Sequence, residues 1–426
     1  MPQEKRPSCE ILRAILKLRP MSRELCLRCK GGRLLCGRPA CPLLARIRIR
    51  SPVESKLKES LFGPSPGIFV GWKGYPNVFV GPLTSIDEEK AELCDNPASW
   101  YGMSFDEIIR MRSLLVRSKV RQNVSERSRV VELTREVALA VNAPDTEVHF
   151  ERRPSFGISF SPLTQPLGPS GPLKKLSIAE NPKIPRKVDA LAGDEVSAGC
   201  AATLLYREGY DVYYLTRVLS SGALGHEERR RLVPTRWSIT AVDDLIGRAL
   251  IEEIHGYRVI NEYRVYHSTY LDNHFEVLLM PRRWEYEQFE AWAPNTLWTL
   301  ALSKPAINVE HEGYHGRSTY AEQEGGGYYA ARFAVLEALA RMRLQAGAVV
   351  FREIYEGYIM PVGVWEVREN VRQAFRRGYE RFSTLGEALE NIGSRLRIPL
   401  REYLRRSTLL NQSRLEDFLP VSGKVK

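Results

Sequence analysis

The sequence of 426 residues contains no long hydrophobic run. A membrane-spanning helix needs about 18 or more consecutive apolar residues, so none is expected. The first residues also lack the uninterrupted apolar stretch of a signal peptide, because Glu4 and Glu10 lie within them. We therefore expect a cytoplasmic protein that makes no contact with a membrane.

The motif of one familiar enzyme class, the Walker A loop, is missing as well. His311 and His315 lie four apart around Glu312, but Gly313 and Gly316 argue against the helix that would place both histidines on one metal ion. Neither a Walker A site nor a metal site at these histidines is expected, and no residue is assigned a catalytic role. Whether the body of the protein is an enzyme stays open at this point.

The order of helical and strand-like segments has no regular βαβ rhythm, which favours an α+β fold. Six prolines between positions 162 and 185 predict a linker or a long loop there. The expected parts are a small basic region containing most of the cysteines (1–60), the N-terminal part of a larger mixed body (61–161), the linker or loop (162–187), the C-terminal part of the body (188–410) and a flexible peptide tail (411–426).

Three segments carry local structural signals. SFDE, residues 104–107, is a capping box and predicts a helix that begins at Ser104. GIFVGWKGYPNVFVGPL has two apolar runs around Gly74-Tyr75-Pro76 and predicts a tight pair of strands. DVYYLTRVL, residues 211–219, is rich in β-branched and aromatic side chains and predicts a strand.

Positive charge is concentrated at the two ends of the chain. Residues 1–60 hold 15 Lys and Arg against 5 Asp and Glu, and residues from 368 onward hold 13 against 7. The middle is slightly acidic although the whole chain has a net charge of +11. Basic ends favour a polyanionic partner, DNA or RNA. The alternative is a surface charge that only keeps the protein soluble.

Four of the seven cysteines fall within sixteen residues, in CLRCKGGRLLCGRPAC. Such a cluster, without a secretion signal, favours metal binding over disulfides. Four thiolates close a tetrahedral shell around zinc and leave no position for a bound water, so one structural zinc is expected. The alternative is four reduced cysteines that merely pack together. The predicted ligands are Cys26, Cys29, Cys36 and Cys41.

Basic residues surround these cysteines, which makes the zinc knuckle a candidate for contact with nucleic-acid phosphates. The residues concerned are Arg28, Lys30, Arg33 and Arg38. A second basic candidate is Arg236, which is followed by Trp237. The pair would stack on a base, or the tryptophan would belong to the core beside a surface arginine.

The tail NQSRLEDFLP places apolar residues where too little chain follows to build a core. Residues three apart share one face of a helical turn, so Leu415 and Phe418 project together, and Leu419 extends the patch. Gln412 offers an amide at its edge. The segment resembles the PCNA-interacting peptide of proteins that dock on the DNA sliding clamp. The alternative is a tail docked on its own domain.

The nearest approach to a chemical site is the region 311–332. Three glycines precede a helix there, and a helix N-terminus after glycines can hold a phosphate. Gly326, Arg317 and Arg332 would form this phosphate or nucleic-acid contact. The alternative is that the glycines only allow a tight turn into a packed helix.

Several phrases of the sequence resemble one known family, the archaeal DNA repair protein NreA family. They are GYPNVFVGP, DNPASWYG, NPKIPRKVD, LVPTRWSITAVDDLIG, GGGYYAARFAVLEAL and PVGVWEVRE. The resemblance covers nearly the whole chain. It implies a cytosolic DNA-repair factor that acts with the sliding clamp PCNA and with other repair proteins, and it carries no catalytic mechanism.

The family's motifs fall on the four clustered cysteines as zinc ligands and on the tail from Gln412 to Leu419 as the clamp motif. This tail ends in Phe-Leu rather than in two aromatic residues, a departure that would weaken clamp binding. A repair factor is therefore the first hypothesis. An enzyme on nucleotides or DNA ends that uses 311–332 is the second, and an RNA-binding protein with the same basic ends is the third.

Overall fold

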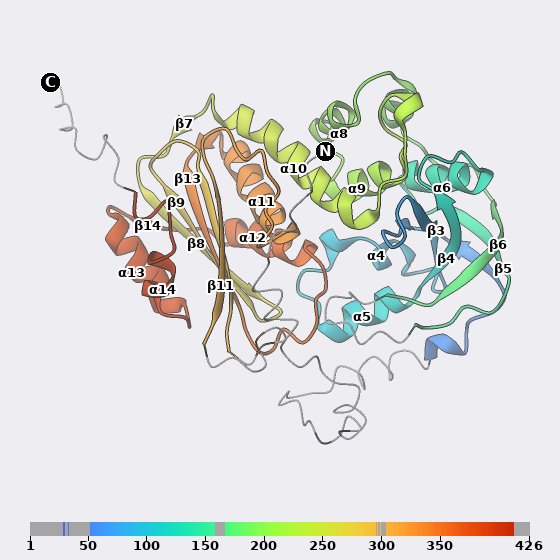
Figure 1. Ribbon diagram of the computed structural model, residues 1–426, viewed down its shortest axis with the longest axis horizontal. Coiled ribbons are helices and arrows are strands. Elements are labelled where there is room, and N and C mark those ends of the chain that lie inside the picture. The colour runs from blue at the N-terminus through green and yellow to red at the C-terminus, as the bar shows by residue number, and fades with distance from the viewer. Residues whose placement is uncertain are drawn as a thin grey trace, which may run out of the picture.

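The computed structural model in Figure 1 contains two six-stranded sheets with helices between and around them. The prediction of an α+β body is confirmed. The residues that the structure describes are Cys29, Arg33, 52–157, 167–294, Thr296, Thr299 and 304–412. No helix in this described part of the chain is both long and apolar enough to cross a membrane.

The first sheet has the strand order β1-β5-β6-β4-β3-β2. Strands β4 and β6 are parallel, and the other neighbours are antiparallel. Apolar clusters line both of its faces, with α6 over one and α5 over the other. Its strands are β1 Ser60–Pro64, β2 Gly67–Val70, β3 Asn77–Ser85, β4 Leu115–Asn123, β5 Asp145–Phe150 and β6 Ser170–Ile178.

The second sheet has the order β11-β10-β13-β9-β8-β14, in which only β10 and β13 are parallel. Its strands are β8 Tyr263–Tyr270, β9 Asn273–Met280, β10 Tyr286–Trp292, β11 Ala306–Glu312, β13 Gly347–Ile354 and β14 Glu380–Phe382. A small separate pair joins β7 Arg258–Val259 to β12 Leu344–Gln345.

Helices cover both faces of the second sheet (Figure 1), with α10, α11 and α12 on one face and α13 and α14 on the other. The helices are α4 Ala91–Cys94, α5 Phe105–Ser113, α6 Arg129–Leu139, α7 Arg186–Gly193, α8 Ala198–Arg207, α9 Val212–Ser220, α10 Thr235–Ile254, α11 Gly326–Met342, α12 Trp365–Arg377, α13 Leu385–Arg395 and α14 Leu400–Leu404, with short 3₁₀ turns at Pro97–Ser99 and Glu227–Arg229.

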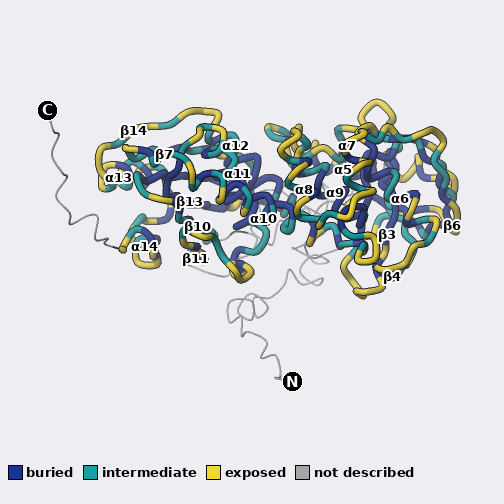
Figure 2. Tube along the Cα trace, turned by 90° about the horizontal axis from the view of Figure 1, so that it is seen from above, coloured by how far each residue is buried: buried dark blue, intermediate teal, exposed yellow. Residues whose placement is uncertain are grey.

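Helix α11 is the centre of the larger core. Its side chains are buried nearly all the way round, as Figure 2 shows by its dark colour. A helix of this kind packs on every side, and here it lies between α10, α12 and the second sheet. The sequence GGYYAARFAVLEALA suits this place because small alanines let the neighbouring helices approach closely.

Two local predictions are confirmed. Ser104 accepts a hydrogen bond from the Glu107 amide while the Glu107 side chain accepts one from the Ser104 amide, which forms the capping box of α5. The two apolar runs around Gly74 form an antiparallel pair, β2 and β3.

The predicted strand at residues 211–219 is wrong, because the segment forms helix α9. Asp211 caps this helix, with one carboxylate oxygen accepting hydrogen bonds from the Tyr213 and Tyr214 amides at 2.8 Å each. Leu215 and Val218, three residues apart, are buried on one face of the helix. Capping and burial therefore outweigh the strand propensity of the β-branched and aromatic residues.

A strand also lies inside the segment 162–187, which the prolines predict to be a linker or loop. Strand β6 pairs with β4 and β5 in the middle of the first sheet. Leu173 and Leu176 of β6 are buried in the core, which stabilises the strand despite its proline content. The passage between the two sheets is instead the helical stretch from α7 to α10.

Candidate functional site

The predicted zinc knuckle lies almost wholly outside the described residues. Cys26, Cys36 and Cys41 are outside them, whereas Cys29 is buried and its carbonyl oxygen accepts a hydrogen bond from the Arg33 amide at 3.2 Å. In the part of the chain that the structure describes, no three His, Cys, Asp or Glu side chains gather to hold a metal ion. Zinc binding stays a prediction.

Most of the basic residues around the knuckle also lie outside the described residues. Arg33 is described and its side chain is exposed to solvent. Arg28, Lys30 and Arg38 lie outside the described residues. Their contact with phosphates therefore also stays a prediction.

The clamp motif begins where the described chain ends. Gln412 is described and exposed, whereas Leu415, Phe418 and Leu419 lie outside the described residues. Just before the motif, the Thr408 amide donates a hydrogen bond to the buried Glu287 carboxylate of β10 at 2.6 Å. This contact holds the chain to the second sheet up to the start of the motif.

The arginines predicted to hold a phosphate are bonded to carboxylates of the protein. Arg332 is fully buried and donates hydrogen bonds to Glu312 at 2.7 Å and to Asp244 at 2.6 Å. Burial acts to lower the pKa of Arg332, but the combined effect of Glu312, Tyr328 and Asp244 outweighs burial and raises it. Arg317 donates to Glu310 at 3.0 Å. These contacts favour a structural role for both arginines.

Gly326 is the first residue of helix α11, so Gly326 and Gly327 lie inside the helix and not before it as predicted. A side chain at the next residue, Gly327, would place its Cβ 3.3 Å from a Glu290 carboxylate oxygen and 3.4 Å from Arg352. The positive end of the helix dipole therefore lies against carboxylates of the protein itself. This arrangement supports the alternative of a tight turn into a packed helix.

Those carboxylates belong to a buried cluster that the sequence analysis missed, the β10–β13 polar cluster. It consists of Glu290, Arg352, Asn273, Glu324 and Glu366. Arg352 donates hydrogen bonds to Glu290 at 2.6 Å and to the Asn273 side-chain oxygen at 2.8 and 3.1 Å. One Glu366 oxygen lies 3.6 Å from Arg352. Strands β9, β10 and β13 and helix α12 thus meet at one arginine.

Two carboxyl groups of the cluster titrate abnormally. Burial raises the pKa of Glu366 to about 7, although Arg352 opposes the rise. Burial also raises the pKa of Glu324, and the neighbouring Glu290 charge adds to the effect. A carboxyl group that titrates near neutral pH can accept and donate a proton, which makes the cluster a candidate for acid-base chemistry.

The position of the cluster agrees with this interpretation. Glu290 and Arg352 face each other in register towards the carboxyl ends of the parallel strands β10 and β13. Ligands of open α/β sheets bind at the carboxyl ends of the strands, and β10 and β13 are the parallel pair of this mixed sheet. The signal that could have found the cluster is a charged residue inside an apolar strand, as in EQFEAW and GAVVFREI.

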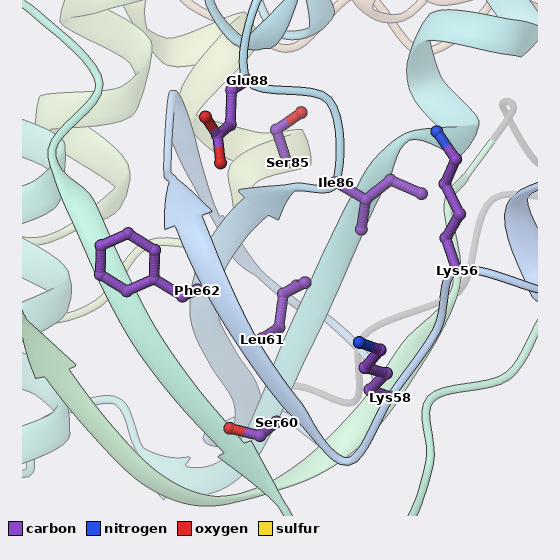
Figure 3. A pocket seen from close by; sticks show the side chains of 8 residues that line it. All are labelled: Lys56, Lys58, Ser60, Leu61, Phe62, Ser85, Ile86 and Glu88. Carbon is purple, nitrogen blue, oxygen red and sulfur yellow. The ribbon is translucent and has the colours of Figure 1, made fainter.

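Figure 3 shows a different feature, a hollow of about 210 Å³ beside β1 that contains Lys56, Lys58 and Glu88. Ser60 at its edge lies 3.2 Å from His149, whose other ring nitrogen lies 3.1 Å from Glu147. The order serine, histidine, carboxylate resembles a catalytic triad. Both His149 and Glu147 are open to water. These three side chains therefore form a solvated contact between paired strands and support no activated nucleophile.

Comparison with known proteins assigns the chain to a family. A family model described as "Archaeal Nre, N-terminal" matches residues 35–299, and one described as "Archaeal Nre, C-terminal" matches residues 312–418. Together they span most of the chain. The chain belongs to the archaeal Nre family. The resemblance found in the sequence is confirmed.

Curated members of the Nre family match over most of their length. "DNA repair protein NreB" of Archaeoglobus fulgidus is 37% identical over 390 residues, which are 91% of this chain and 97% of that protein. "DNA repair protein NreA" of the same organism is 39% identical, over 85% of this chain and 92% of its own length. "DNA repair protein NreA" of Haloferax volcanii is 37% identical, over 84% and 88%. No solved structure matches this chain.

The boundary between the two Nre family models does not divide the fold. It falls between residues 299 and 312, next to β11. Strand β11 pairs with β10, and β10 pairs with β13, so one sheet contains segments from both models. The β10–β13 polar cluster likewise joins Glu290 from the first model to Arg352 from the second. In this chain, the two regions that the family models match therefore contribute strands to one sheet.

Proposed function

We propose that this Nre protein is a DNA-repair factor that the PCNA sliding clamp recruits to damaged DNA. The observation that carries the proposal is its identity of 37–39% to three relatives named DNA repair proteins, over 84–91% of the chain. The basic ends support it, because a positively charged segment binds the DNA backbone.

The clamp-binding role rests on the tail. The Asn411 side chain donates a hydrogen bond to the Ser407 carbonyl oxygen at 2.9 Å, and Ser407 itself bonds to the buried Glu287. The next residue, Gln412, is exposed and opens the motif. The motif itself supports recruitment, with Leu415, Phe418 and Leu419 as its apolar residues and the Gln412 amide at its edge.

The N-terminal region is proposed to provide a structural zinc finger and contacts with DNA. Four cysteines in one short segment supply a closed thiolate shell, which holds a fold together and leaves no open position for catalysis. The basic residues between them would contact phosphates of the DNA backbone. Their role is to position the protein on DNA without reading sequence.

A second candidate function is an enzyme that processes nucleotides or DNA ends. Its support is the β10–β13 polar cluster, where burial raises the pKa of Glu366 to about 7 beside the ion pair of Arg352 and Glu290. Such a carboxyl group could act as a general acid or base near neutral pH. This candidate replaces the phosphate site predicted at 311–332, whose arginines bind carboxylates.

One experiment tests both candidates. Purified full-length protein is mixed with gapped, nicked and cross-linked DNA, with and without the clamp, and both retention on DNA and reaction products are measured. The repair factor predicts that the clamp increases retention and that the DNA is recovered unchanged. Products that disappear in Glu366→Gln protein would favour the enzyme. Retention that the clamp leaves unchanged would contradict recruitment.

A further inference from the structure

Exposed aromatic side chains gather on one part of the surface. Among the described residues, six large aromatic side chains are exposed, and five of them belong to the β2–β3 hairpin, the first turn of α10 and the segment before α11. Exposed tryptophans are uncommon unless they bind a partner. The five are Trp72, Tyr75, Phe79, Trp237 and Tyr320, with exposed fractions between 44% and 54%.

Contacts between distant parts of the chain bring the β2–β3 hairpin to the start of α10. The ring centroids of Tyr75 and Trp237 lie 5.1 Å apart at an angle of 53°. The Val70 amide donates a hydrogen bond to the Thr235 hydroxyl at 2.9 Å, which fixes the start of α10 against β2. The two rings are tilted and not stacked face to face, and both side chains are exposed, so part of each ring is accessible to a ligand.

The hairpin turn itself is ordered by its backbone. The Asn77 amide donates a hydrogen bond to the Gly74 carbonyl oxygen at 2.9 Å, and the Gly71 amide donates one to the Phe79 carbonyl oxygen at 2.7 Å. Gly74 has a φ of 83°, a left-handed conformation that glycine adopts without strain. These hydrogen bonds order the backbone that carries Trp72 and Tyr75.

Cations lie between and beside the rings. The Arg236 guanidinium lies 5.8 Å from the centroid of Trp72, and the Lys73 ammonium lies 6.0 Å from it. Lys119 lies 6.0 Å from the centroid of Phe79, and Arg121 pairs with Phe79 in the β3–β4 register. Burial raises the pKa of Tyr320, and nearby Arg236 opposes the rise.

The charge of this surface is not neutralised by the protein. Among the described residues, none of the four cations forms an ion pair with a carboxylate. Their charges are therefore available to an anionic ligand. The cations concerned are Lys73, Lys119, Arg121 and Arg236.

We propose that this aromatic–basic surface, made by the five rings and the four cations, binds unpaired single-stranded DNA by stacking on its bases and by pairing with its phosphates. Single strands bind to surfaces of this composition, because each base has a free face and each nucleotide carries one negative charge. A duplex offers its phosphates but keeps its bases stacked. The inference rests on the proposed function in DNA repair and names the form of DNA that the body holds.

The test measures binding of full-length protein to a fluorescent oligothymidine and to a duplex of the same length. Trp72→Ala and Trp237→Ala should each weaken binding of the single strand by about tenfold, because each removes one stacking partner. Trp237→Phe keeps a ring and should retain most of the affinity. Duplex affinity should change little in all three variants.

Phe62→Ala is the matched control. Phe62 is 58% exposed and also lies in the first sheet, but it belongs to β1 and to the hollow of Figure 3. Its loss should leave single-strand affinity unchanged. Wild-type affinity in both Trp72→Ala and Trp237→Ala would overturn the inference and leave the surface to a protein partner. An equal loss in Phe62→Ala would also overturn it.

The result is separable from the proposed function. Binding of the clamp to the same variants is measured in parallel, and it should equal that of the wild type because the motif lies in the tail. Single-strand binding that depends on the tryptophans, together with no clamp binding, would support this surface and contradict clamp recruitment. Normal clamp binding with tryptophan-independent DNA binding would contradict this surface alone.

Discussion

Arg368 of α12 forms a buried two-point ion pair with Asp243 of α10, with nitrogen–oxygen distances of 2.5 and 3.1 Å. Both side chains are almost fully removed from water. The pair joins two of the helices that enclose α11. Replacing either residue with an uncharged one leaves the other charge buried without a partner. This loss lowers stability far more than the loss of an ion pair on the surface.

The first prediction is that Arg368→Met lowers the free energy of unfolding by about 3–5 kcal/mol, because it leaves Asp243 alone in the core. Chemical denaturation monitored by circular dichroism measures the change. The matched control is Arg376→Met on the exposed side of the same helix, which should change stability by less than about 0.5 kcal/mol. Equal stability of the two variants would contradict this role of the pair.

The second prediction concerns the effect of pH on stability through Glu366. Burial raises the pKa of Glu366 from 4.5 to about 7. Between these values the folded protein binds more protons than the unfolded chain, so this group makes stability fall as pH rises. Glutamine does not titrate. Glu366→Gln should therefore gain stability over the wild type as pH rises from 4.5 to 7, by up to about 3 kcal/mol.

Melting temperatures of the two proteins across this pH range measure the effect. The control is Glu390→Gln on the exposed face of α13. A constant difference between wild type and Glu366→Gln at every pH would contradict the raised pKa of Glu366.

The third prediction is one zinc per chain, bound at Zn–S distances of about 2.3 Å. Elemental analysis of Cys29→Ser protein should show most of the zinc lost, while the melting temperature of the body stays the same, since metal binding stabilises only the knuckle. Cys200→Ser, at an exposed cysteine of α8, should keep its zinc. Wild-type protein free of zinc after purification without chelator would contradict the metal site.

The fourth prediction concerns salt. The first 51 residues carry 13 Lys and Arg against 3 Asp and Glu. A truncation that tests their role should end at residue 51, because Val53 and Leu57 are buried in the body. Removing 1–51 should flatten the log–log dependence of DNA affinity on salt, because fewer counterions are released. Removing 413–426, which has a net charge of +1, should leave the slope unchanged. An unaltered slope without 1–51 would place the contacts elsewhere.

Local signals in the sequence were sufficient for some elements of the fold. The capping box at Ser104 and Glu107 acts within four residues, so the start of α5 is readable from the sequence. The aromatic and β-branched residues of 211–219 predict a strand, and only the cap at Asp211 together with burial decides for a helix. The bond between Asp243 of α10 and Arg368 of α12 spans 125 residues, so no local pattern indicates it.

The candidate site was harder to predict because its parts are far apart in the chain. Arg352 and Glu290 are separated by 62 residues and meet only when β10 and β13 pair in parallel. The single-strand surface has the same character, since Tyr75 and Trp237 come from different elements. Arg236 and Trp237 carried a local signal of base stacking, and the structure supplies the exposed neighbours that a stacking surface requires.

Clamp recruitment is the central claim, and titration calorimetry of full-length protein with PCNA tests it most directly. We expect a micromolar Kd, because binding of a short peptide must also order it. Phe418→Ala should remove about 2 kcal/mol or more of binding energy, since the aromatic ring buries the most area in the motif. Gln412→Ala at the edge should cost less. Equal affinities of wild-type and Phe418→Ala protein would contradict recruitment through the tail.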